Sequence, residues 1–460
     1  MQQIFAIISL TWKAAFRYRL FWVITALLLA AVVGLPILVK DDGTAAGFAQ
    51  ILITYTLGAV TGLLGFCTLW LACGTLARDV EECQIQMIAV KPIGRWQIWL
   101  GKWLGSVSLN AARLAVAGRS IYGLLEWRAR RLPAAELAKL QNEVLVARGS
   151  AREQNPDAFI AQEADRLLKD RMEKRQLADA DPNIVRQQLE QQLKAELQAV
   201  PPGGMRWWVI HLGAARNYLK DQPLFLRTKF HTALTVQPDT VYADWQVGTP
   251  RKTPIWQDEM SLAPDAFHEF PVDPNLFDEK GDLIIGFRNP NDTVLLFGLD
   301  DGMEVLYREG GFGLNLVRGL GIILCWMALL AALGLAAASL MSFPVAAFFS
   351  LALLGISLSS GTLTNVVSDG TLMGYDGEKG TKGHSPLDNV AVPIFRAMLD
   401  VINLVQQFSP IDSLTTGRSI TWQELGLAFS QIVLLLGGVL SLTGIFIFQR
   451  RELATAQGTS

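Results

Sequence analysis

The chain has few of the residues from which metal, disulfide and catalytic sites are built. Its 460 residues include only four cysteines and four histidines, and no two cysteines form a Cys-x-x-Cys pair. No two histidines stand at the spacing of metal ligands, and no nucleophile is paired with a base. The sequence therefore predicts no metal, no cofactor, no disulfide framework and no catalytic site in this chain.

Binding of nucleotides and of nucleic acids is also not indicated. Gly94, Gly101 and Lys102 come nearest to a phosphate-binding loop, but six residues separate the glycines and Trp103 follows the lysine. This order fails the GxxxxGK[ST] spacing that cradles phosphates. The formal net charge of −2 provides no basic surface for nucleic acid. ATP and magnesium, if the protein works with them, must be bound by a partner polypeptide.

Long uncharged segments are what the sequence does contain, and hydrophobic residues make up 51% of the chain. Uncharged runs cover residues 20–39, 51–77, 319–368 and 425–448. At about 1.5 Å of rise per residue, a helix of this length crosses roughly 30 Å of hydrocarbon. The run at 319–368 is long enough for a hairpin of two helices that turns near Pro344. Five membrane spans are therefore predicted.

A sixth span is predicted at residues 98–125 from the charges at the two ends of the chain. Cytoplasmic loops are enriched in lysine and arginine, and the first and last spans are flanked by Lys13, Arg17, Arg19, Arg450 and Arg451. Both termini are then cytoplasmic, which requires an even number of crossings. We expect a polytopic α-helical protein with about six transmembrane helices in a bacterial inner membrane.

This sixth span carries polar residues that need a protein environment. Asn110 and Arg113 lie near its middle, where an arginine costs roughly 2.5–3.5 kcal/mol. We expect Arg113 to face the helix bundle or a polar cavity. It either bonds to a neighbouring helix or, with Asn110, lines a substrate pathway.

The predicted organisation has six parts. They are residues 1–125 (an interfacial helix, two spans, a cytoplasmic segment at 78–97 and the third span), 126–204 (external helices), 205–312 (an external β module), 313–368 (two spans), 369–424 (an external loop with an amphipathic helix) and 425–460 (the last span and a cytoplasmic tail).

The external insertion changes its periodicity part of the way along. Residues 133–200 are rich in Ala, Glu, Gln, Arg and Leu, which predicts two or three exposed helices. Residues 241–247 alternate between apolar and polar, as a half-buried strand does. Three more strands, joined by two turns, are predicted at 283–288, 293–299 and 303–308. The pattern predicts a small antiparallel β-sandwich or jelly-roll-like module.

Two tryptophans of this module, Trp245 and Trp256, have two interpretations. Their rings could stack on a sugar or another ligand. Aromatic residues in a small sandwich can equally belong to its core.

The segment at residues 78–97 joins the second span to the third. Acidic residues lie near its start and a proline follows its amphipathic stretch, as suits a short rigid element that transmits a force. The alternative is a solvated cytoplasmic loop. The residues expected to couple to a partner are Arg78, Asp79, Glu81, Glu82, Lys91, Pro92 and Arg95.

In this region the chain resembles a known family, the six-helix permeases of type-2 ATP-binding-cassette exporters, and is similar to those of gliding and nitrous-oxide-reductase maturation systems. The shared pattern is a Glu-rich charged segment, a short amphipathic stretch, Lys91-Pro92-Ile93-Gly94-Arg95, and then Gly101-Lys102 opening the third span. The chain differs in having Cys83-Gln84 after the acidic residues and a large insertion between spans three and four.

The resemblance implies a permease subunit that uses the ATP hydrolysis of a separate cytoplasmic ATPase to export a lipid-linked, glycan or other hydrophobic substrate. A second copy of the chain, an extracytoplasmic protein and membrane lipid are the other implied partners. Gly58 and Gly62 form a GxxxG pair that could pack against the second copy or within the bundle. Two alternatives remain open: mechanotransmission to the external partner without transport, and a membrane-anchored receptor.

Overall fold

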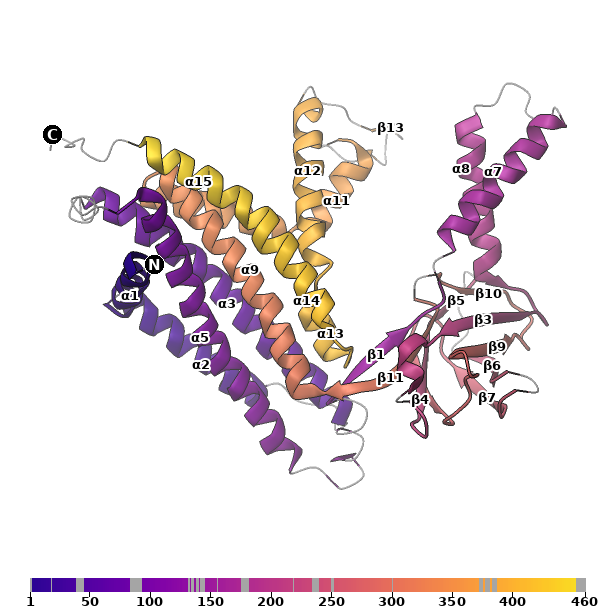
Figure 1. Ribbon diagram of the computed structural model, residues 1–460. Coiled ribbons are helices and arrows are strands. Elements are labelled where there is room, and N and C mark those ends of the chain that lie inside the picture. The colour runs from indigo at the N-terminus through magenta and orange to yellow at the C-terminus, as the bar shows by residue number, and fades with distance from the viewer. Residues whose placement is uncertain are drawn as a thin grey trace. The chain divides into compact units, whose positions relative to one another are not determined.

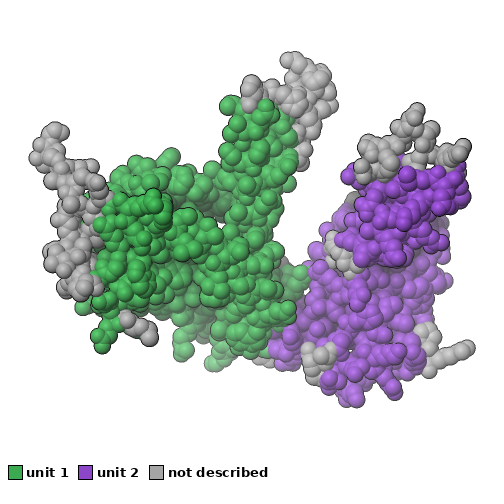
Figure 2. Space-filling view, turned by 45° about the horizontal axis from the view of Figure 1, so that its top comes forward, with its two compact units in different colours: residues 1–146, 311–460 green, residues 147–310 purple. Residues whose placement is uncertain are grey.

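The computed structural model describes residues 2–17, 19–38, 45–82, 93–130, 133, 136–137, 140, 145–154, 156–174, 182–217, 219–233, 240–249, 252–299, 301–371, 375–376, 381–382 and 387–451. The chain forms two compact units (Figures 1 and 2). Residues 1–146 and 311–460 form a helical unit, and residues 147–310 form a unit that contains the β-sheets.

Helices make up most of the first unit. They are α1 (Gln2–Arg17), α2 (Arg19–Leu38), α3 (Ala45–Glu81), α5 (Arg95–Ala129), α9 (Phe312–Leu340), α10 (Phe343–Leu358), α11 (Ser360–Asp369), α12 (Asp388–Gln406), α13 (Pro410–Thr415), α14 (Trp422–Ala428), the π-helical segment η3 (Phe429–Gly437) and α15 (Gly438–Arg450).

Helix α9 is the centre of the helical unit, since α3, α5, α10, η3 and α15 all pack against it. It is apolar on nearly every side, as a buried helix must be. Small residues allow the closest approach. A side-chain carbon at Gly334 would lie 2.8 Å from the methyl group of Ala72 on α3, so only glycine fits there.

Among the described residues, three helices are long and apolar enough to cross a membrane: Ile51–Glu81, Phe312–Leu340 and Trp422–Arg450. The pair α1 and α2, bent by 76°, adds a fourth if it counts as one span. Helix α10 is apolar but short. Helix α5 is long enough, but Lys102, Arg113 and Arg119 make it too polar to be counted by composition. The count of six spans therefore remains a prediction.

The second unit contains two four-stranded sheets around one core. The strand orders are β1-β11-β4-β8 and β3-β9-β6-β7, and a three-stranded sheet has the order β2-β10-β5. The strands are β1 (Val146–Ala151), β2 (Ala199–Val200), β3 (Met205–His211), β4 (Leu224–Thr228), β5 (Phe230–Thr232), β6 (Val241–Val247), β7 (Trp256–Leu262), β8 (His268–Val272), β9 (Asp282–Arg288), β10 (Leu295–Phe297) and β11 (Met303–Gly311).

Buried residues from both four-stranded sheets, among them Trp208, Leu226, Trp245, Phe270 and Phe287, form one hydrophobic cluster. Two sheets that share a core in this way make a sandwich. Strand β6 buries Val241, Ala243, Trp245 and Val247, which confirms the alternation expected there.

The helices predicted between residues 133 and 200 are confirmed in part. Helices α7 (Asp157–Glu173) and α8 (Pro182–Gln198) lie in that region and pack together. The helical prediction is wrong at β1, which pairs with β11. Its partner lies far along the chain, and Ser150 and Arg152 bond to Glu304 of β11. Such long-range pairing overrides local helix propensity.

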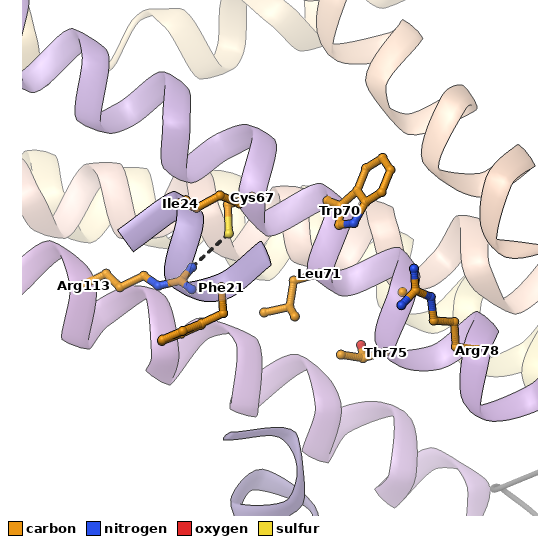
Figure 3. Close-up of a pocket in the computed structure, with 9 residues that line it drawn as sticks. Phe21, Ile24, Cys67, Trp70, Leu71, Thr75, Arg78 and Arg113 are labelled. Carbon is orange, nitrogen blue, oxygen red and sulfur yellow. Dashed lines mark hydrogen bonds between the residues drawn. The ribbon is translucent and has the colours of Figure 1, made fainter. Parts of the chain in front are cut away.

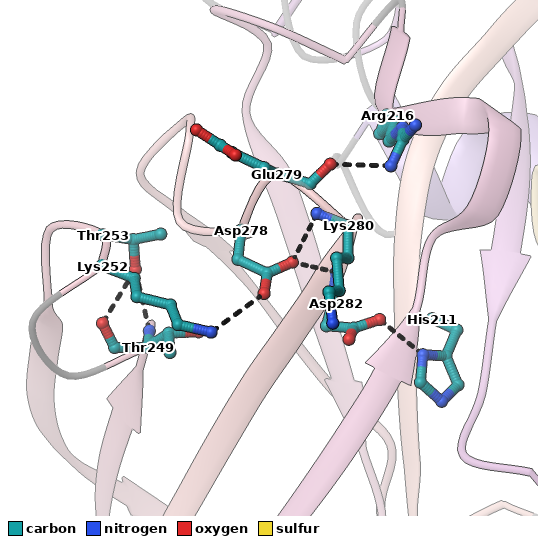
Figure 4. Close-up of polar contacts among 9 residues, drawn as sticks. All are labelled: His211, Arg216, Thr249, Lys252, Thr253, Asp278, Glu279, Lys280 and Asp282. Carbon is teal, nitrogen blue, oxygen red and sulfur yellow. Dashed lines mark hydrogen bonds and ion pairs between the residues drawn. The ribbon is translucent and has the colours of Figure 1, made fainter.

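The three later strands are confirmed as β9, β10 and β11, but they do not form neighbouring hairpins. Each belongs to a different sheet. The turn before β9 is held by Asp278, whose carboxylate accepts bonds from the backbone N–H groups of Lys280 and Asp282 at 2.9 and 3.0 Å (Figure 4). The bond from the Asp282 N–H is the main reason that the pKa of Asp278 is lowered.

A candidate coupling site at one end of the helical unit

The candidate site begins where α3 ends and α5 starts. Helix α3 ends at Glu81 and α5 begins at Arg95. Lys91 and Pro92 were predicted to take part, but they lie outside the described residues, as does Cys83. The remaining five predicted coupling residues are described, and four of them contact other helices of the unit.

Asp79 forms an ion pair with Lys102 of α5. The Lys102 ammonium donates to the Asp79 carboxylate at 2.5 Å and to the backbone carbonyl of Thr75 at 2.6 Å. The Lys102 side chain is 7% exposed and that of Asp79 is 22% exposed. This pair ties the last turns of α3 to the first turns of α5.

Glu81 binds the start of α10. Its carboxylate accepts a hydrogen bond from the backbone N–H of Phe343 at 2.8 Å, and Phe343 is the first residue of α10. The first N–H groups of a helix have no partner within the helix, and the helix dipole favours a negative charge there. Glu81 therefore caps α10 from another helix. Arg78 adds a contact, since its guanidinium lies 4.4 Å from the Phe343 ring centre.

Arg95 binds the end of α15 in the complementary way. Its guanidinium donates to the backbone carbonyls of Phe448, Gln449 and Arg451, at 3.2, 2.8 and 2.8 Å. These are carbonyls that a helix end leaves unpaired, and a cation is favoured beside them.

Arg451 extends the same arrangement to α9. Its guanidinium donates to the carbonyls of Ala338 and Ser339, at 3.0 and 3.2 Å, in the last turn of α9. Sequence reasoning assigned Arg451 only to a basic cluster beside the last span. The sequence shows the basic residue, but it does not show that Arg451 bonds to the carbonyl of Ser339, 112 residues away.

The site therefore consists of charged side chains at the end of α3 and the start of α5, which contact other helices of the unit. Asp79, Glu81 and Arg95 bond to α5, α10 and α15 respectively. Glu82, the fifth residue, is exposed at the end of α3.

Asn110 and Arg113, the predicted pathway residues, lie elsewhere in the same unit. Asn110 is buried and donates to the Thr68 hydroxyl at 2.8 Å. Arg113 is 7% exposed, donates to the Cys67 sulfur at 3.0 Å, and has its guanidinium 4.3 Å from the Phe21 ring centre. The expectation that Arg113 faces the protein interior agrees with this burial.

A cavity of about 260 Å³ lies beside Arg113 (Figure 3). Its walls come from α2, α3 and α5 and include Phe21, Trp70, Leu71 and Arg78. The cavity is mostly apolar and has guanidinium groups on two sides. Asn110 is not among its lining residues, so this cavity is lined by only one of the two predicted pathway residues.

The stacking role predicted for Trp245 does not fit the structure. Trp245 is fully buried, with its ring 4.8 Å from that of Phe287 between centres, so no ring face is left for a ligand. Trp256 is partly buried and stacks on Phe270 at 6.0 Å. Within the described ranges, no three His, Cys, Asp or Glu side chains come together in a group that could hold a metal ion.

No protein-family model matches the sequence, and no curated protein matches it.

Proposed function

We propose that this chain is the membrane subunit of an ATP-driven exporter whose ATPase is a separate cytoplasmic protein. In this proposal about six helices cross the membrane, both termini are cytoplasmic, and the β module is external. The observation that carries the proposal is the candidate coupling site, in which Glu81 of α3 and Arg95 of α5 bond to the ends of α10 and α15.

A partner that moves residues 83–92 would displace Glu81 and Arg95 together. Their partners are backbone groups at the start of α10 and the end of α15. Backbone groups cannot swing away as side chains do, so a displacement reaches the helices as rigid bodies.

The proposed substrate is a lipid-linked, glycan or other hydrophobic molecule. The mostly apolar cavity between α2, α3 and α5 supports a substrate with an apolar part. A second copy of the chain is the proposed partner within the membrane. Gly58 and Gly62 support this, because no atom of the described residues lies within 4 Å of a side-chain carbon placed at either position. A helix of the second copy could therefore pack closely against these two glycines.

Mechanotransmission without transport is a second candidate, and one observation favours it. Strand β11 ends at Gly311 and α9 begins at Phe312, with no residue between them. The central helix of the membrane unit thus continues directly into the β module. In this candidate function, movement of α9 would act on the β module through this direct connection of the chain.

The test is purification of the tagged full chain from its native membrane in mild detergent, with ATPase activity measured in the eluate. We expect an ATPase subunit to copurify. Glu82→Lys should lower its recovery about tenfold, which corresponds to roughly 1.4 kcal/mol of binding free energy. Glu82 suits this test because it is exposed and is not among the residues that cap α10 and α15.

Glu126→Lys is the matched control, since Glu126 is an exposed glutamate at the other end of α5. It should copurify as much ATPase as the wild type. Absence of ATPase activity from the wild-type eluate would reject the exporter and mechanotransmission proposals together, and a membrane-anchored receptor would become the better account.

A further inference from the structure

The cavity beside Arg113 has the properties of a binding site. It has a volume of about 260 Å³, and its apolar walls include Phe21, Ile24, Trp70 and Leu71. Arg113 comes from the middle of α5 and Arg78 from the end of α3. Figure 3 shows the two guanidinium groups on opposite sides of the cavity.

The guanidinium of Arg113 has one satisfied nitrogen and two unsatisfied ones. Nη1 donates to the Cys67 sulfur. Nε and Nη2 are buried and have no hydrogen-bond partner among the described residues. These two nitrogens form one edge of the planar group, the edge that binds two oxygens of a carboxylate or phosphate side by side. The edge left open is therefore one suited to an oxyanion.

A buried cation without a counter-charge is costly, because its desolvation is not repaid. Arg113 is 7% exposed, and its contacts with the Cys67 sulfur and the Phe21 ring carry no full negative charge. No carboxylate of the described chain forms an ion pair with it; Asp79, the acidic residue of α3 nearest in sequence to the cavity, bonds to Lys102. An anionic ligand would supply the missing charge.

The walls decide what kind of anion fits. Cys67 and Arg78 are eleven residues apart on α3, which is about 16 Å along the helix axis. Between these positions the cavity is lined by Trp70, Leu71 and Gly74 on the same helix. Apolar walls stabilise an apolar ligand by about 25 cal/mol per Å² of buried surface, whereas they offer nothing to a small hydrated ion.

We propose that this cavity binds an anionic membrane lipid, with the phosphate of its headgroup on the Nε and Nη2 edge of Arg113 and its apolar part against Phe21, Ile24 and Leu71. The proposal concerns the cavity that also supports an apolar substrate, but it does not rest on the coupling function, since lipid binding here needs no ATPase. Its failure would leave the ATPase copurification result unaffected.

The test is native mass spectrometry of the detergent-purified, delipidated full chain titrated with dioleoyl phosphatidylglycerol or dioleoyl phosphatidylcholine. The two lipids share their chains and differ in headgroup charge. We expect one phosphatidylglycerol to bind at least tenfold more tightly than phosphatidylcholine. Arg113→Gln should abolish this preference, because it removes both the charge and the two-nitrogen edge.

Two further variants test whether the lipid preference depends on this cavity or on the positive charge of the protein in general. Arg119→Gln removes an exposed arginine of the same helix and should leave the preference unchanged. Ile24→Trp fills the cavity while keeping Arg113, and should also abolish the preference. Size-exclusion chromatography checks that each variant keeps the wild-type elution volume.

Three results would overturn the proposal. The first is an unchanged preference in both Arg113→Gln and Ile24→Trp. The second is an equal loss in Arg119→Gln, which would indicate non-specific attraction to basic residues. The third is full displacement of phosphatidylglycerol by inorganic phosphate at the same concentration, which would identify a site for free anions.

Discussion

At the scale of single residues, the pair Asp79 and Lys102 shows how charge is accommodated in the helical unit. Lys102 is almost fully buried and makes two short bonds, one to a carboxylate and one to a carbonyl. Breaking a buried ion pair by removing one partner costs more than the pair contributes, because the other charge is left without compensation. The consequence can be measured with a pair of variants.

We predict that Lys102→Met destabilises the protein by about 2 kcal/mol, less than the loss of one partner of a fully buried pair costs, because Asp79 is 22% exposed. The double variant Asp79→Asn/Lys102→Met should recover at least half of this loss, since no charge is left unpaired. The measurement is the midpoint of thermal unfolding in detergent, followed by tryptophan fluorescence. A double variant no more stable than Lys102→Met alone would contradict the argument.

Residue-scale predictions from sequence succeeded where a physical cost applied to one side chain. The cost of arginine in hydrocarbon placed Arg113 against the protein interior, and the structure buries it. No comparable energetic cost distinguishes the two interpretations of Trp245. Whether its ring stacks on a ligand or packs in the core depends on the residues around it, which the sequence does not show. Its full burial among strands β6 and β9 depends on the paired sheet and is not visible in one strand.

At the scale of elements, the helix ends are the most informative feature of the unit. Glu81 and Arg95 bond to backbone groups that the ends of α10 and α15 leave unpaired. Capping of this kind contributes about 0.5–2 kcal/mol per helix end. Helix α10 is apolar and short, so its starting turn depends strongly on such a partner.

We predict that Glu81→Ala speeds hydrogen exchange at the Phe343 amide by about five- to tenfold, because this N–H loses its acceptor. Glu81→Gln should have a smaller effect, since its amide oxygen can still accept. Glu82→Ala is the control: it changes the adjacent glutamate, which is not the acceptor of this N–H. The measurement is hydrogen exchange by mass spectrometry on peptides covering the start of α10. Equal rates in Glu81→Ala and Glu82→Ala would refute the cap.

Elements with strong local periodicity were predictable, and their partners were not. The alternation in residues 241–247 fixed β6, and the turn signals fixed β9, β10 and β11. Their separation into three sheets depends on pairings with β2, β3 and β4. Strand β1 was missed because nothing in its own sequence alternates strongly; its pairing with β11 determines its conformation.

At the scale of the whole molecule, the compact units and the predicted parts of the chain are divided at different residues. The β-containing unit runs from Ala147 to Gly310, whereas composition placed the external domain at residues 126–312. Helix α5 continues to Ala129, and residues up to Val146 belong to the helical unit. The absence of charged residues shows where a hydrophobic segment ends. The helix that contains the segment can continue beyond that point into polar sequence.

In the proposed topology, the two ends of α5 lie on opposite sides of the membrane. Trp96 and Trp127 are exposed tryptophans near these two ends, at 45% and 51% exposure. Trp96 lies beside Arg95 at the coupling site, and Trp127 lies near the end that leads to the β module. They therefore make a matched pair of positions.

The most direct measurement is site-specific photo-cross-linking in native membranes, with a photoreactive phenylalanine analogue in place of Trp96 or Trp127. The account predicts that position 96 captures an ATPase subunit and that position 127 captures none. Capture of the ATPase from position 127, or from neither position while it copurifies with the intact protein, would contradict a coupling site at the junction of α3 and α5.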